Sequence, residues 1–503
     1  MASPRLKPKR GGARMADRRG RVEQRSRARH SRERVARGAR RLRVTVIGLG
    51  KVGAPLAATL AARGFDVVGV DKNRDFVEAI HQGRAPIVEP RLQEMMDLAG
   101  GRIRATTDCV AAVASSELSF VVVPTPSDAT GRFSLRYVLE AARDIGRGLS
   151  EHPGRPVVVL VSTVMPGDTD AQLRPALEAA SGKRCGAGFG LCYSPEFIAL
   201  GNVVTDILRP DFVLIGSSDD HSAAALARIY ARLCETDPPI CRMNLVNAEL
   251  TKLAVNSYVT MRISFANALA QICEGLPGAD VERVTATMSL DSRIGSKYLR
   301  GALSFGGPCF PRDNRALGVV AHRADVAPVL AEATDEVNRV HLDRLLQLVL
   351  RRCPNGGTVA VLGLAYKANT PVVEASPGTD LVAKLRAAGI PVTVYDPLAM
   401  AAARAMFGEG VAYAKTAREA VGSADVVVLT TPCDEFRSLR PDDLRPGRPM
   451  VIDCWRILPA EAFAPASNYV VIGRGPDAKV VIQAQRDVGA ESVQERGPSH
   501  RAS

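Results

Sequence analysis

The sequence lacks any hydrophobic run long enough to cross a membrane. No segment approaches the roughly 18 consecutive apolar residues that a membrane-spanning helix needs, and the N-terminus has no apolar core of a secretory signal. The ten cysteines form no Cys-x-x-Cys or Cys/His pairing, which argues against a zinc site. We therefore expect a cytoplasmic protein with no membrane partner and no metal, whose cysteines stay reduced.

The body of the chain also lacks an excess of either charge. The formal net charge is +13, but of the 66 Lys+Arg and 53 Asp+Glu, 15 and 3 lie in residues 1–40, which leaves 51 and 50 for the rest. This basic arm has almost no apolar periodicity, so we expect it to be disordered. It could contact nucleic acid or an anionic surface, but we favour a dispensable extension, or an upstream start with the working start at or after Met15. Nucleic acid is therefore not an expected partner.

The segment 43–71 has the pattern of a dinucleotide-binding βαβ unit. A β-branched run leads into a Gly-x-Gly-x-x-Gly turn, an alanine-rich helix follows, and a second strand ends in an acidic residue. Gly48 allows the tight turn, Gly50 lets a pyrophosphate approach the backbone, and Gly53 lets helix and strand pack. Asp71 would bind the adenosine ribose hydroxyls and repel a 2′-phosphate, which favours NAD over NADP.

Three polar residues follow later hydrophobic strands. Thr125 lies at the end of the segment 118–126, and Thr163 lies in the segment 157–167. Because ligands bind outside the carboxyl ends of parallel strands, both are candidate cofactor or active-site hydroxyls, although a threonine that caps the next helix is the alternative. Glu196 follows a short strand, and taken alone it would be read as a solvated surface carboxylate.

The segment 247–274 contains no proline or glycine and carries apolar residues at helical spacing. This pattern predicts a long helix that is buried on more than one side. Lys252 and Asn256 lie four residues apart and therefore share one face, where both could donate to an oxyanion. The alternative is a lysine whose ammonium reaches out to solvent.

One cysteine stands out because of its surroundings. Cys309 lies in the segment 303–313 between two glycines and two prolines, with Asp313 four residues further on. Glycines admit a close ligand, prolines fix the chain, and the nearby Arg312 would favour a thiolate. The segment alone allows either a nucleophile or a buried structural cysteine.

Strand and helix alternate again from residue 355 onward, so the chain is pseudo-symmetric. We predict an α/β fold with two Rossmann-like doubly wound lobes joined by a long central helix. The expected domains are a disordered basic arm 1–40, an NAD-binding Rossmann domain 41–240, a central helical domain 241–345 that carries the Cys309 loop, a second nucleotide-fold-like domain 346–478 and a disordered tail 479–503.

Several motifs, met in order along the chain, resemble the UDP-glucose/GDP-mannose dehydrogenase family from about residue 43 to residue 473. They are Gly-Leu-Gly-Lys-Val-Gly, Val-Pro-Thr-Pro, Ser-Thr-Val-x-Pro-Gly, Ser-Pro-Glu-Phe, Lys-Leu-Ala-x-Asn, Ile-Ser-Phe-Ala-Asn, Phe-Gly-Gly-x-Cys-Phe-Pro-x-Asp and Gly-Leu-Ala-Tyr-Lys. The resemblance implies an NAD-dependent four-electron oxidation of the C6 alcohol of a nucleotide sugar to a carboxylate. It also implies that domain 241–345 forms a homodimer through the central helix and that domain 346–478 binds the nucleotide sugar.

The resemblance further implies roles for individual residues. Cys309 is the expected nucleophile, which would form a thiohemiacetal and then a thioester. The other expected catalytic groups are Lys252, Asn256, Asp313, Glu196 and Thr163. The expected cofactor contacts are Gly48, Gly50, Val52, Gly53, Asp71, Thr125 and Thr163. The expected substrate contacts are Glu196, Phe197, Lys252, Arg293, Tyr298, Phe305, Gly306 and Lys367.

Three departures from the family pattern leave the sugar open. Glu374 stands where an arginine is usual, Ala199 stands where the family commonly has Arg, and Trp455-Arg456 replaces the usual Arg-Asn. We expect UDP-glucose to be the substrate, with UDP-N-acetylhexosamines and GDP-mannose as alternatives. A two-electron Rossmann dehydrogenase and a non-enzymatic nucleotide-sugar-binding or nucleic-acid-binding protein are the other classes considered.

Overall fold

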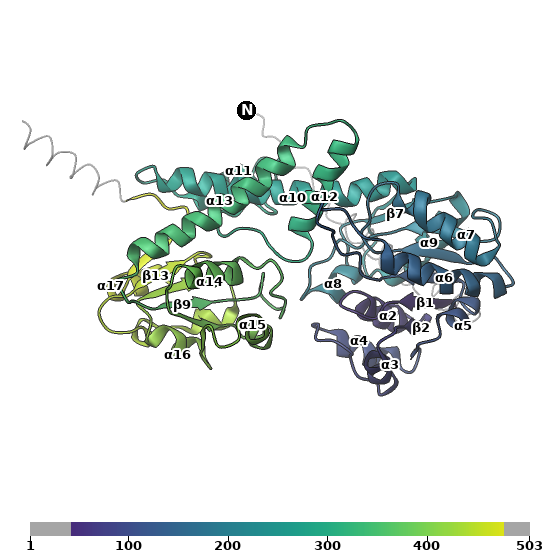
Figure 1. Ribbon diagram of the computed structural model, residues 1–503, viewed down its shortest axis with the longest axis horizontal. Coiled ribbons are helices and arrows are strands. Elements are labelled where there is room, and N and C mark those ends of the chain that lie inside the picture. Colours follow the sequence, from purple (N-terminus) through teal and green to yellow (C-terminus); the bar gives the residue numbers. More distant parts are fainter. Residues whose placement is uncertain (1–41, 477–503) are drawn as a thin grey trace, which may run out of the picture.

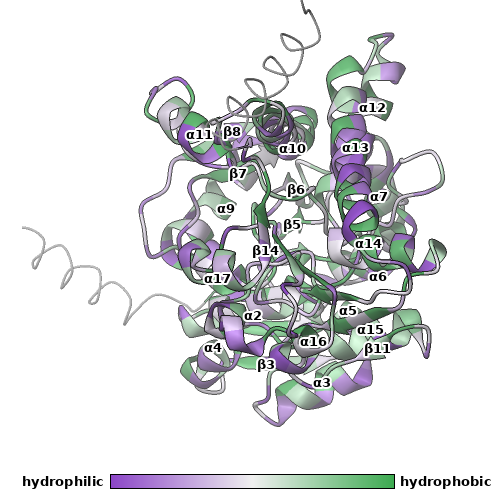
Figure 2. Ribbon diagram, turned by 90° about the vertical axis from the view of Figure 1, so that its left-hand side faces the viewer, coloured by the Kyte–Doolittle hydropathy of each residue, from purple (hydrophilic) through white to green (hydrophobic). Residues whose placement is uncertain are grey.

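The computed structural model describes residues 42–476. The two predictions of disorder, for the arm 1–40 and the tail 479–503, lie outside these residues. The described part has two α/β lobes side by side, with a layer of helices running across both of them (Figure 1). In Figure 2 the strands at the centre are coloured hydrophobic, whereas outlying helices such as α3 carry hydrophilic stretches. None of the helices described is both long and apolar enough to cross a membrane.

The first lobe is built on an eight-stranded sheet of order β3-β2-β1-β4-β5-β6-β7-β8. Strands β1 to β6 are parallel, in the 3-2-1-4-5-6 order of doubly wound dinucleotide-binding folds, and β7 pairs antiparallel with β6. Their short hydrophobic runs are buried on both faces because helices cover both sides of the sheet. The strands are β1 Arg43–Ile47, β2 Asp66–Val70, β3 Ile103–Thr106, β4 Leu118–Val121, β5 Val157–Leu160, β6 Gly190–Tyr193, β7 Val213–Ser217 and β8 Ile240–Met243. The helices are α2 Gly53–Ala62, α3 Arg74–His81, α4 Leu92–Ala99, α5 Cys109–Ala114, α6 Arg136–Glu151, α7 Arg174–Ser181, α8 Val203–Leu208 and α9 Asp220–Leu233.

Four helices make up the central part: α10 Leu245–Glu274, α11 Val281–Ser289, α12 Phe310–Arg323 and α13 Val329–Arg352. Helix α10 begins where the Asn244 side chain accepts the backbone N–H of Asn247, at 3.0 Å. Its buried side chains face β7 of the first lobe as well as α12 and α13, which agrees with the prediction that this helix is buried on more than one side. A stripe of large apolar side chains along it is exposed in the single chain: Leu250, Tyr258, Phe265 and Ile272.

The second lobe repeats the strand order of the first. Its six-stranded parallel sheet has the order β11-β10-β9-β12-β13-β14, which is again 3-2-1-4-5-6 when its strands are numbered from one. The prediction of two Rossmann-like lobes joined by a long central helix is thereby confirmed. The strands are β9 Val359–Leu362, β10 Val392–Tyr395, β11 Ala412–Tyr413, β12 Val426–Leu429, β13 Met450–Asp453 and β14 Asn468–Val471. The helices are α14 Pro377–Ala387, α15 Met400–Phe407, α16 Ala417–Gly422 and α17 Ala460–Ala466.

Candidate active site

The turn between β1 and α2 fits a dinucleotide. Gly48 has φ +95°, and a Cβ on Gly53 would lie 1.8 Å from the Gly48 carbonyl oxygen, so both positions require glycine. A Cβ on Gly50 would meet nothing within 4 Å, which leaves space over the turn for a pyrophosphate. At the end of β2, the Asp71 carboxylate accepts the backbone N–H of Leu49 at 2.6 Å. The acidic group is thus held beside the turn, where a ribose would lie.

The N-terminus of α2 completes this cradle. Its N-cap residue, Val52, has no side-chain hydrogen bond, and the first turn of the helix carries no acidic residue. The positive end of the helix dipole is therefore available to an anionic pyrophosphate.

The two threonines at the strand ends contact each other through one hydrogen bond. The Thr125 hydroxyl donates to the backbone carbonyl of Thr163, at 2.7 Å. It therefore does not cap the following helix α6, whose N-cap is Leu135. The bond fixes the turn after β5 against the turn after β4.

The Cys309 loop is held from both sides by backbone contacts. On one side, the Asn338 amide on α13 accepts the N–H of Phe305 at 2.8 Å and donates to its carbonyl at 2.9 Å. On the other side, the N–H of Gly307 donates to the carbonyl of Ala375 in the second lobe, at 3.1 Å. Cys309 itself is the N-cap residue of α12.

The thiol of Cys309 is not activated in the way its neighbours in the sequence predicted. Although Cys309 is accessible to solvent, desolvation and the Asp313 carboxylate raise its pKa. Lys252 and Arg312 lower the pKa by less, and Glu374 raises it further. Arg312 thus favours the thiolate, as expected, but desolvation and the carboxylates outweigh it.

Lys252 and Asn256 lie on the face of α10 that points toward this loop, and both are buried. The Lys252 ammonium donates to the backbone carbonyl of Glu196 at 2.8 Å and lies 4.6 Å from the centre of the Phe197 ring. Desolvation lowers the pKa of Lys252, while Asp313, Cys309 and Glu196 oppose that shift. The alternative of a lysine reaching out to solvent is therefore excluded.

Asn256 connects α10 to α12. Its amide donates to the Asp313 carboxylate at 2.6 Å, and Arg312 lies 3.3 Å from the other carboxylate oxygen. Arg312 also donates to the carbonyl of Thr125 at 3.0 Å. Asp313 is thus linked to both the central helix and the cofactor side of the first lobe.

Glu196 is not a solvated surface carboxylate. Burial raises its pKa to about 7, although a hydrogen bond from Tyr230 and the charge of Lys252 act in the opposite direction. A carboxyl group with this pKa can accept and release a proton near neutral pH. It therefore has the acidity that a general base needs.

The remaining predicted substrate contacts differ in their surroundings. Tyr298 packs edge-on against Phe310, with ring centres 6.3 Å apart, so it contacts the residue that directly follows Cys309. Phe305 and Gly306 belong to the buried part of the Cys309 loop. Arg293 is instead paired with Asp291 in the loop after α11, and 86% of its side chain is exposed.

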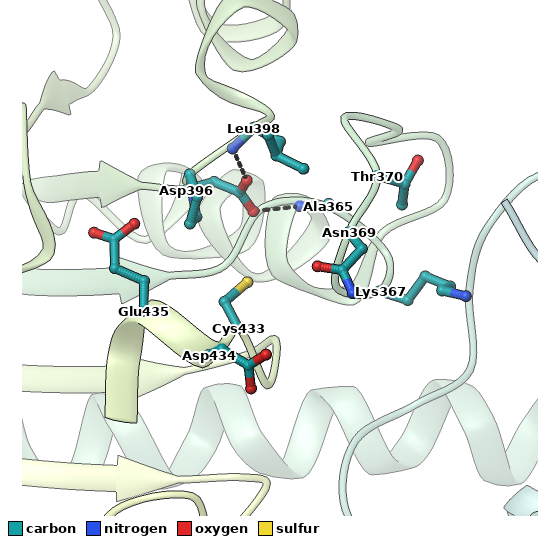
Figure 3. A pocket seen from close by; sticks show the side chains of 10 residues that line it. Ala365, Lys367, Asn369, Thr370, Asp396, Leu398, Cys433, Asp434 and Glu435 are labelled. Atoms are coloured by element: carbon teal, nitrogen blue, oxygen red, sulfur yellow. Dashed lines mark hydrogen bonds between the residues drawn. The ribbon is translucent and has the colours of Figure 1, made fainter. Parts of the chain in front are cut away.

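Lys367 lines a cavity of about 210 Å³ at the carboxyl ends of the second-lobe strands (Figure 3). Asp396 lies in this cavity and accepts the backbone N–H groups of Ala365 at 3.0 Å and Leu398 at 2.8 Å, drawn as dashed lines. Lys367 extends away from Asp396 in the same view. Its pKa is lowered by burial, while the carboxylates of Asp206 and Glu89 in the first lobe oppose that shift.

Three buried or half-buried polar residues that position the site were missed from the sequence. Glu249 on α10 accepts the N–H groups of Gly167 at 2.6 Å and Thr169 at 2.9 Å, just after the Thr163 turn. Glu89 accepts the N–H groups of Gly201 and Val203, both at 2.9 Å. The third is Asn338, described above. Isolated polar residues carry no local pattern, so only the folded chain shows which N–H groups reach them.

The departures from the family pattern have different environments. Arg456 pairs with Asp280 at 2.6 Å and so ties the second lobe to the start of α11. The Trp455 indole N–H donates to the carbonyl of Thr430 at 2.8 Å. Glu374, by contrast, lies within electrostatic reach of Cys309.

A dinucleotide cradle in one lobe, a solvent-accessible cysteine with a lysine and a carboxylate nearby, and a second nucleotide-type lobe are the features of an NAD-dependent dehydrogenase acting on a nucleotide-containing substrate. Family models agree with this class. The NAD binding, central and UDP binding domains of the UDP-glucose/GDP-mannose dehydrogenase family match residues 42–234, 246–340 and 360–460.

Individual proteins are similar over most of their length. UDP-glucose 6-dehydrogenase AglM of Haloferax volcanii is 38% identical over 421 residues, which cover 83% of this chain and 97% of that protein. GDP-mannose 6-dehydrogenase of Azotobacter vinelandii is 35% identical over 359 residues, covering 71% of this chain and 81% of that protein. The structure of a UDP-glucose dehydrogenase from Pyrobaculum islandicum matches with a TM-score of 0.79 and 32% identity, over 88% of this chain and 98% of that one.

The chain belongs to the UDP-glucose/GDP-mannose dehydrogenase family and is an NAD-dependent nucleotide-sugar 6-dehydrogenase.

Proposed function

We propose that the chain oxidises UDP-glucose to UDP-glucuronate through a thiohemiacetal and a thioester on Cys309. The observation that carries the chemistry is the grouping around Cys309, where Lys252, Asp313 and Glu374 all lie within electrostatic reach of the thiol. The preference for UDP-glucose is supported by relatives of that printed activity at 38% and 32% identity. A GDP-mannose relative at 35% identity makes GDP-mannose the second candidate, and a UDP-N-acetylhexosamine remains the third.

NAD, when bound in the first lobe, accepts the two hydrides that leave C6, one for each molecule of cofactor. After the first loss the substrate is an aldehyde, and Cys309 Sγ adds to its carbonyl carbon to form the thiohemiacetal. Lys252 and Asn256 are the proposed donors to the oxygen that becomes an alkoxide, since both lie on the α10 face beside the loop. Loss of the second hydride leaves a thioester on the same sulfur.

Hydrolysis then releases the acid and restores the thiol. Glu196 is the proposed base that takes a proton from water as the water oxygen attacks the thioester carbonyl, and its pKa of about 7 suits that task. Thr163 and Asp313 are the proposed groups that orient this water. The carbon–sulfur bond breaks, and the departing sulfur takes up a proton to regenerate Cys309.

Substrate recognition is proposed to involve both lobes. Lys367 and the cavity beside Asp396 would bind the nucleotide part, as the match to the UDP binding domain supports. Phe197, Tyr298, Phe305 and Gly306 would contact the sugar and diphosphate, and Arg293 keeps its proposed substrate role. Gly48, Gly50, Val52, Gly53, Asp71, Thr125 and Thr163 are the proposed contacts to NAD.

A homodimer is proposed to form through α10. Tyr258, Phe265 and Ile272 follow one another at seven-residue spacing along the helix and are 57%, 50% and 56% exposed. Exposing such an apolar stripe to water costs free energy, and the stripe could be buried by packing against the same stripe on a second copy of the chain.

A panel of nucleotide sugars with NAD tests the proposed substrate and stoichiometry. We expect UDP-glucose to give the highest kcat/KM and two NADH for each UDP-glucose consumed. One NADH per sugar with accumulation of an aldehyde or ketone would overturn the four-electron mechanism, and a higher kcat/KM with GDP-mannose would overturn the substrate.

A further inference from the structure

A buried chain of hydroxyl groups leads from Glu196 into the first lobe. The Tyr230 hydroxyl donates to Glu196 Oε1 at 3.3 Å and lies 2.9 Å from Ser194 Oγ. The Ser194 hydroxyl donates to the backbone carbonyl of Leu214 at 2.8 Å. Ser194 is 1% and Tyr230 is 4% exposed, so water does not compete for these bonds.

The Leu214 end sets the direction of the chain, because a carbonyl accepts hydrogen bonds and never donates one. With the Ser194 proton directed at Leu214, Ser194 Oγ can accept from Tyr230 but has no proton to offer it. Tyr230 then has one proton and two acceptors, Ser194 Oγ and Glu196 Oε1. Burial also raises the pKa of Tyr230 well above its ordinary value, so the phenol keeps this proton.

The protonation of Glu196 decides which acceptor Tyr230 serves. When Glu196 is ionised, its carboxylate accepts a charge-assisted hydrogen bond from the Tyr230 hydroxyl, which keeps its proton. When Glu196 is protonated, its own O–H can donate to the Tyr230 oxygen, and the Tyr230 proton turns to Ser194. All three hydroxyl protons then have an acceptor.

We propose that Tyr230 and Ser194 are positioning residues that hold Glu196 in the hydrolysis step, through a hydrogen-bond chain in which the Glu196–Tyr230 bond reverses its direction when Glu196 takes the proton from water. The inference rests on the proposed role of Glu196. No proton leaves the phenol or the serine in this reversal: the Tyr230 hydroxyl rotates from Glu196 to Ser194, while the Ser194 hydroxyl keeps its bond to the Leu214 carbonyl. The proton taken from water stays on Glu196 until solvent removes it. Glu196 is then ionised again, and the Tyr230 hydroxyl turns back to donate its hydrogen bond to the carboxylate.

Other charged or titratable groups around Glu196 come from three elements and do not form part of the chain. They are the Lys252 ammonium from α10, Asp206 from α8 and the Cys234 thiol after α9. Lys252 lowers the pKa of Glu196 and Asp206 raises it. Because these groups are unchanged in variants of the hydroxyl chain, a shift in such variants reports the chain itself.

Removing the two hydroxyls should move the titration of Glu196 in opposite directions. Tyr230→Phe removes a donor that serves the ionised carboxylate more strongly than the neutral acid, so the pKa should rise by roughly half a unit to one unit. Ser194→Ala removes the acceptor that Tyr230 uses only when Glu196 is protonated, so the pKa should fall. If both residues had only a structural role, the two variants would not shift the pKa of Glu196 in opposite directions.

Two measurements test this on the full chain. The first is the pH dependence of kcat, in which the limb near pH 7 should move up in Tyr230→Phe and down in Ser194→Ala. The second is an infrared pH titration of the carboxyl stretch of Glu196, assigned by its loss in Glu196→Gln, which needs neither substrate nor turnover. Tyr469→Phe is the matched control, because Tyr469 donates to Asp453 in the second lobe at 2.9 Å and should leave the Glu196 titration unmoved.

The outcomes separate the chain from the function. If Glu196→Gln keeps the limb near pH 7, the proposed role of Glu196 as the base is wrong. The proposed hydrogen-bond chain of hydroxyls is then tested by the infrared titration alone. If Glu196→Gln removes the limb but Tyr230→Phe and Ser194→Ala shift it in the same direction or not at all, the proposed hydrogen-bond chain is wrong while the role of Glu196 stands.

Discussion

Replacing Lys252 with methionine should remove catalysis without unfolding the protein. The ammonium lies beside Cys309 and Glu196, and losing one oxyanion donor costs about 2.7–4 kcal/mol, or roughly 10²–10³ in kcat. Lys252 also lowers the pKa of Cys309, so the variant should hold less thiolate at neutral pH. We therefore expect kcat to fall by at least about 10²-fold.

Stability should respond differently, because two effects of the same change oppose each other. The pKa of Lys252 is lowered by desolvation, so its charge costs free energy in the folded state, and methionine removes that cost. Against this, the Glu196 carbonyl loses its 2.8 Å hydrogen bond, worth about 0.5–1.5 kcal/mol. We expect the melting temperature at pH 7 to stay within about 3 °C of the unchanged protein.

The pH dependence of stability gives a further sign to check. Since the folded-state pKa of Lys252 lies below the ordinary 10.5, the unfolded chain binds the proton more tightly between these two values. The Lys252 contribution to stability therefore increases as pH rises through that window, and it should vanish in Lys252→Met. Circular dichroism melts from pH 7 to pH 10 measure this difference between the two proteins.

Initial rates of NADH formation and these melts together distinguish a catalytic role of Lys252 from a role in the stability of the fold. Lys415→Met is a suitable control, because Lys415 is an exposed lysine of the second lobe and should keep both rate and melting temperature. If Lys252→Met retained more than about a tenth of kcat, the oxyanion role would be refuted. A parallel loss of rate and a large drop in melting temperature would mean instead that Lys252 supports the fold.

Three further changes probe other parts of the molecule. Cys309→Ser should abolish acid formation while NAD and UDP-glucose still bind, as calorimetry can show; normal turnover would exclude the covalent step. Gly53→Ala should weaken NAD binding strongly, because the added Cβ would lie 1.8 Å from the Gly48 carbonyl, and an unchanged Kd by fluorescence titration would contradict the cradle. Phe265→Asp should convert a dimer into monomers in sedimentation velocity, and an unchanged mass would show that α10 is not the interface.

The parts that could be predicted from the sequence depend on short-range patterns. The β1–α2–β2 unit follows from a glycine turn between hydrophobic runs, and its acidic residue falls at a fixed place after the second strand. Lys252 and Asn256 share a helix face by spacing alone. The order of strands in both lobes follows from the same alternation of elements.

The rest depends on contacts between distant segments. The pKa of Cys309 depends not only on the nearby Asp313 and Arg312 but also on desolvation by the folded protein and on Lys252 and Glu374, which lie far away along the chain. Glu89 and Asn338 position the site because their side chains accept hydrogen bonds from backbone N–H groups that are 112 and 33 residues away in the chain. Tyr230 could not be singled out either, since a tyrosine at helical spacing is indistinguishable from an ordinary core residue.

The two lobes share one turn geometry but use it differently. Gly48 and Gly363 both donate a backbone N–H to the end of the neighbouring strand, at 2.8 and 2.9 Å, and Asp71 and Asp396 both accept the next backbone N–H. In the first lobe, four residues separate the turn glycine from the glycine that packs against it. In the second lobe, fourteen residues separate Gly363 from Gly378.

The extra residues of the second lobe bring Ala375 against the Cys309 loop, where its carbonyl holds the N–H of Gly307. The turn that fits a cofactor in the first lobe is thus followed, in the second lobe, by a segment that supports the Cys309 loop. Moving the second lobe away would break the bond from Gly307 to Ala375 and leave the loop held by Asn338 on one side only. The position of the Cys309 loop therefore depends in part on the spacing of the two lobes, so a motion of one lobe against the other would also shift this cysteine.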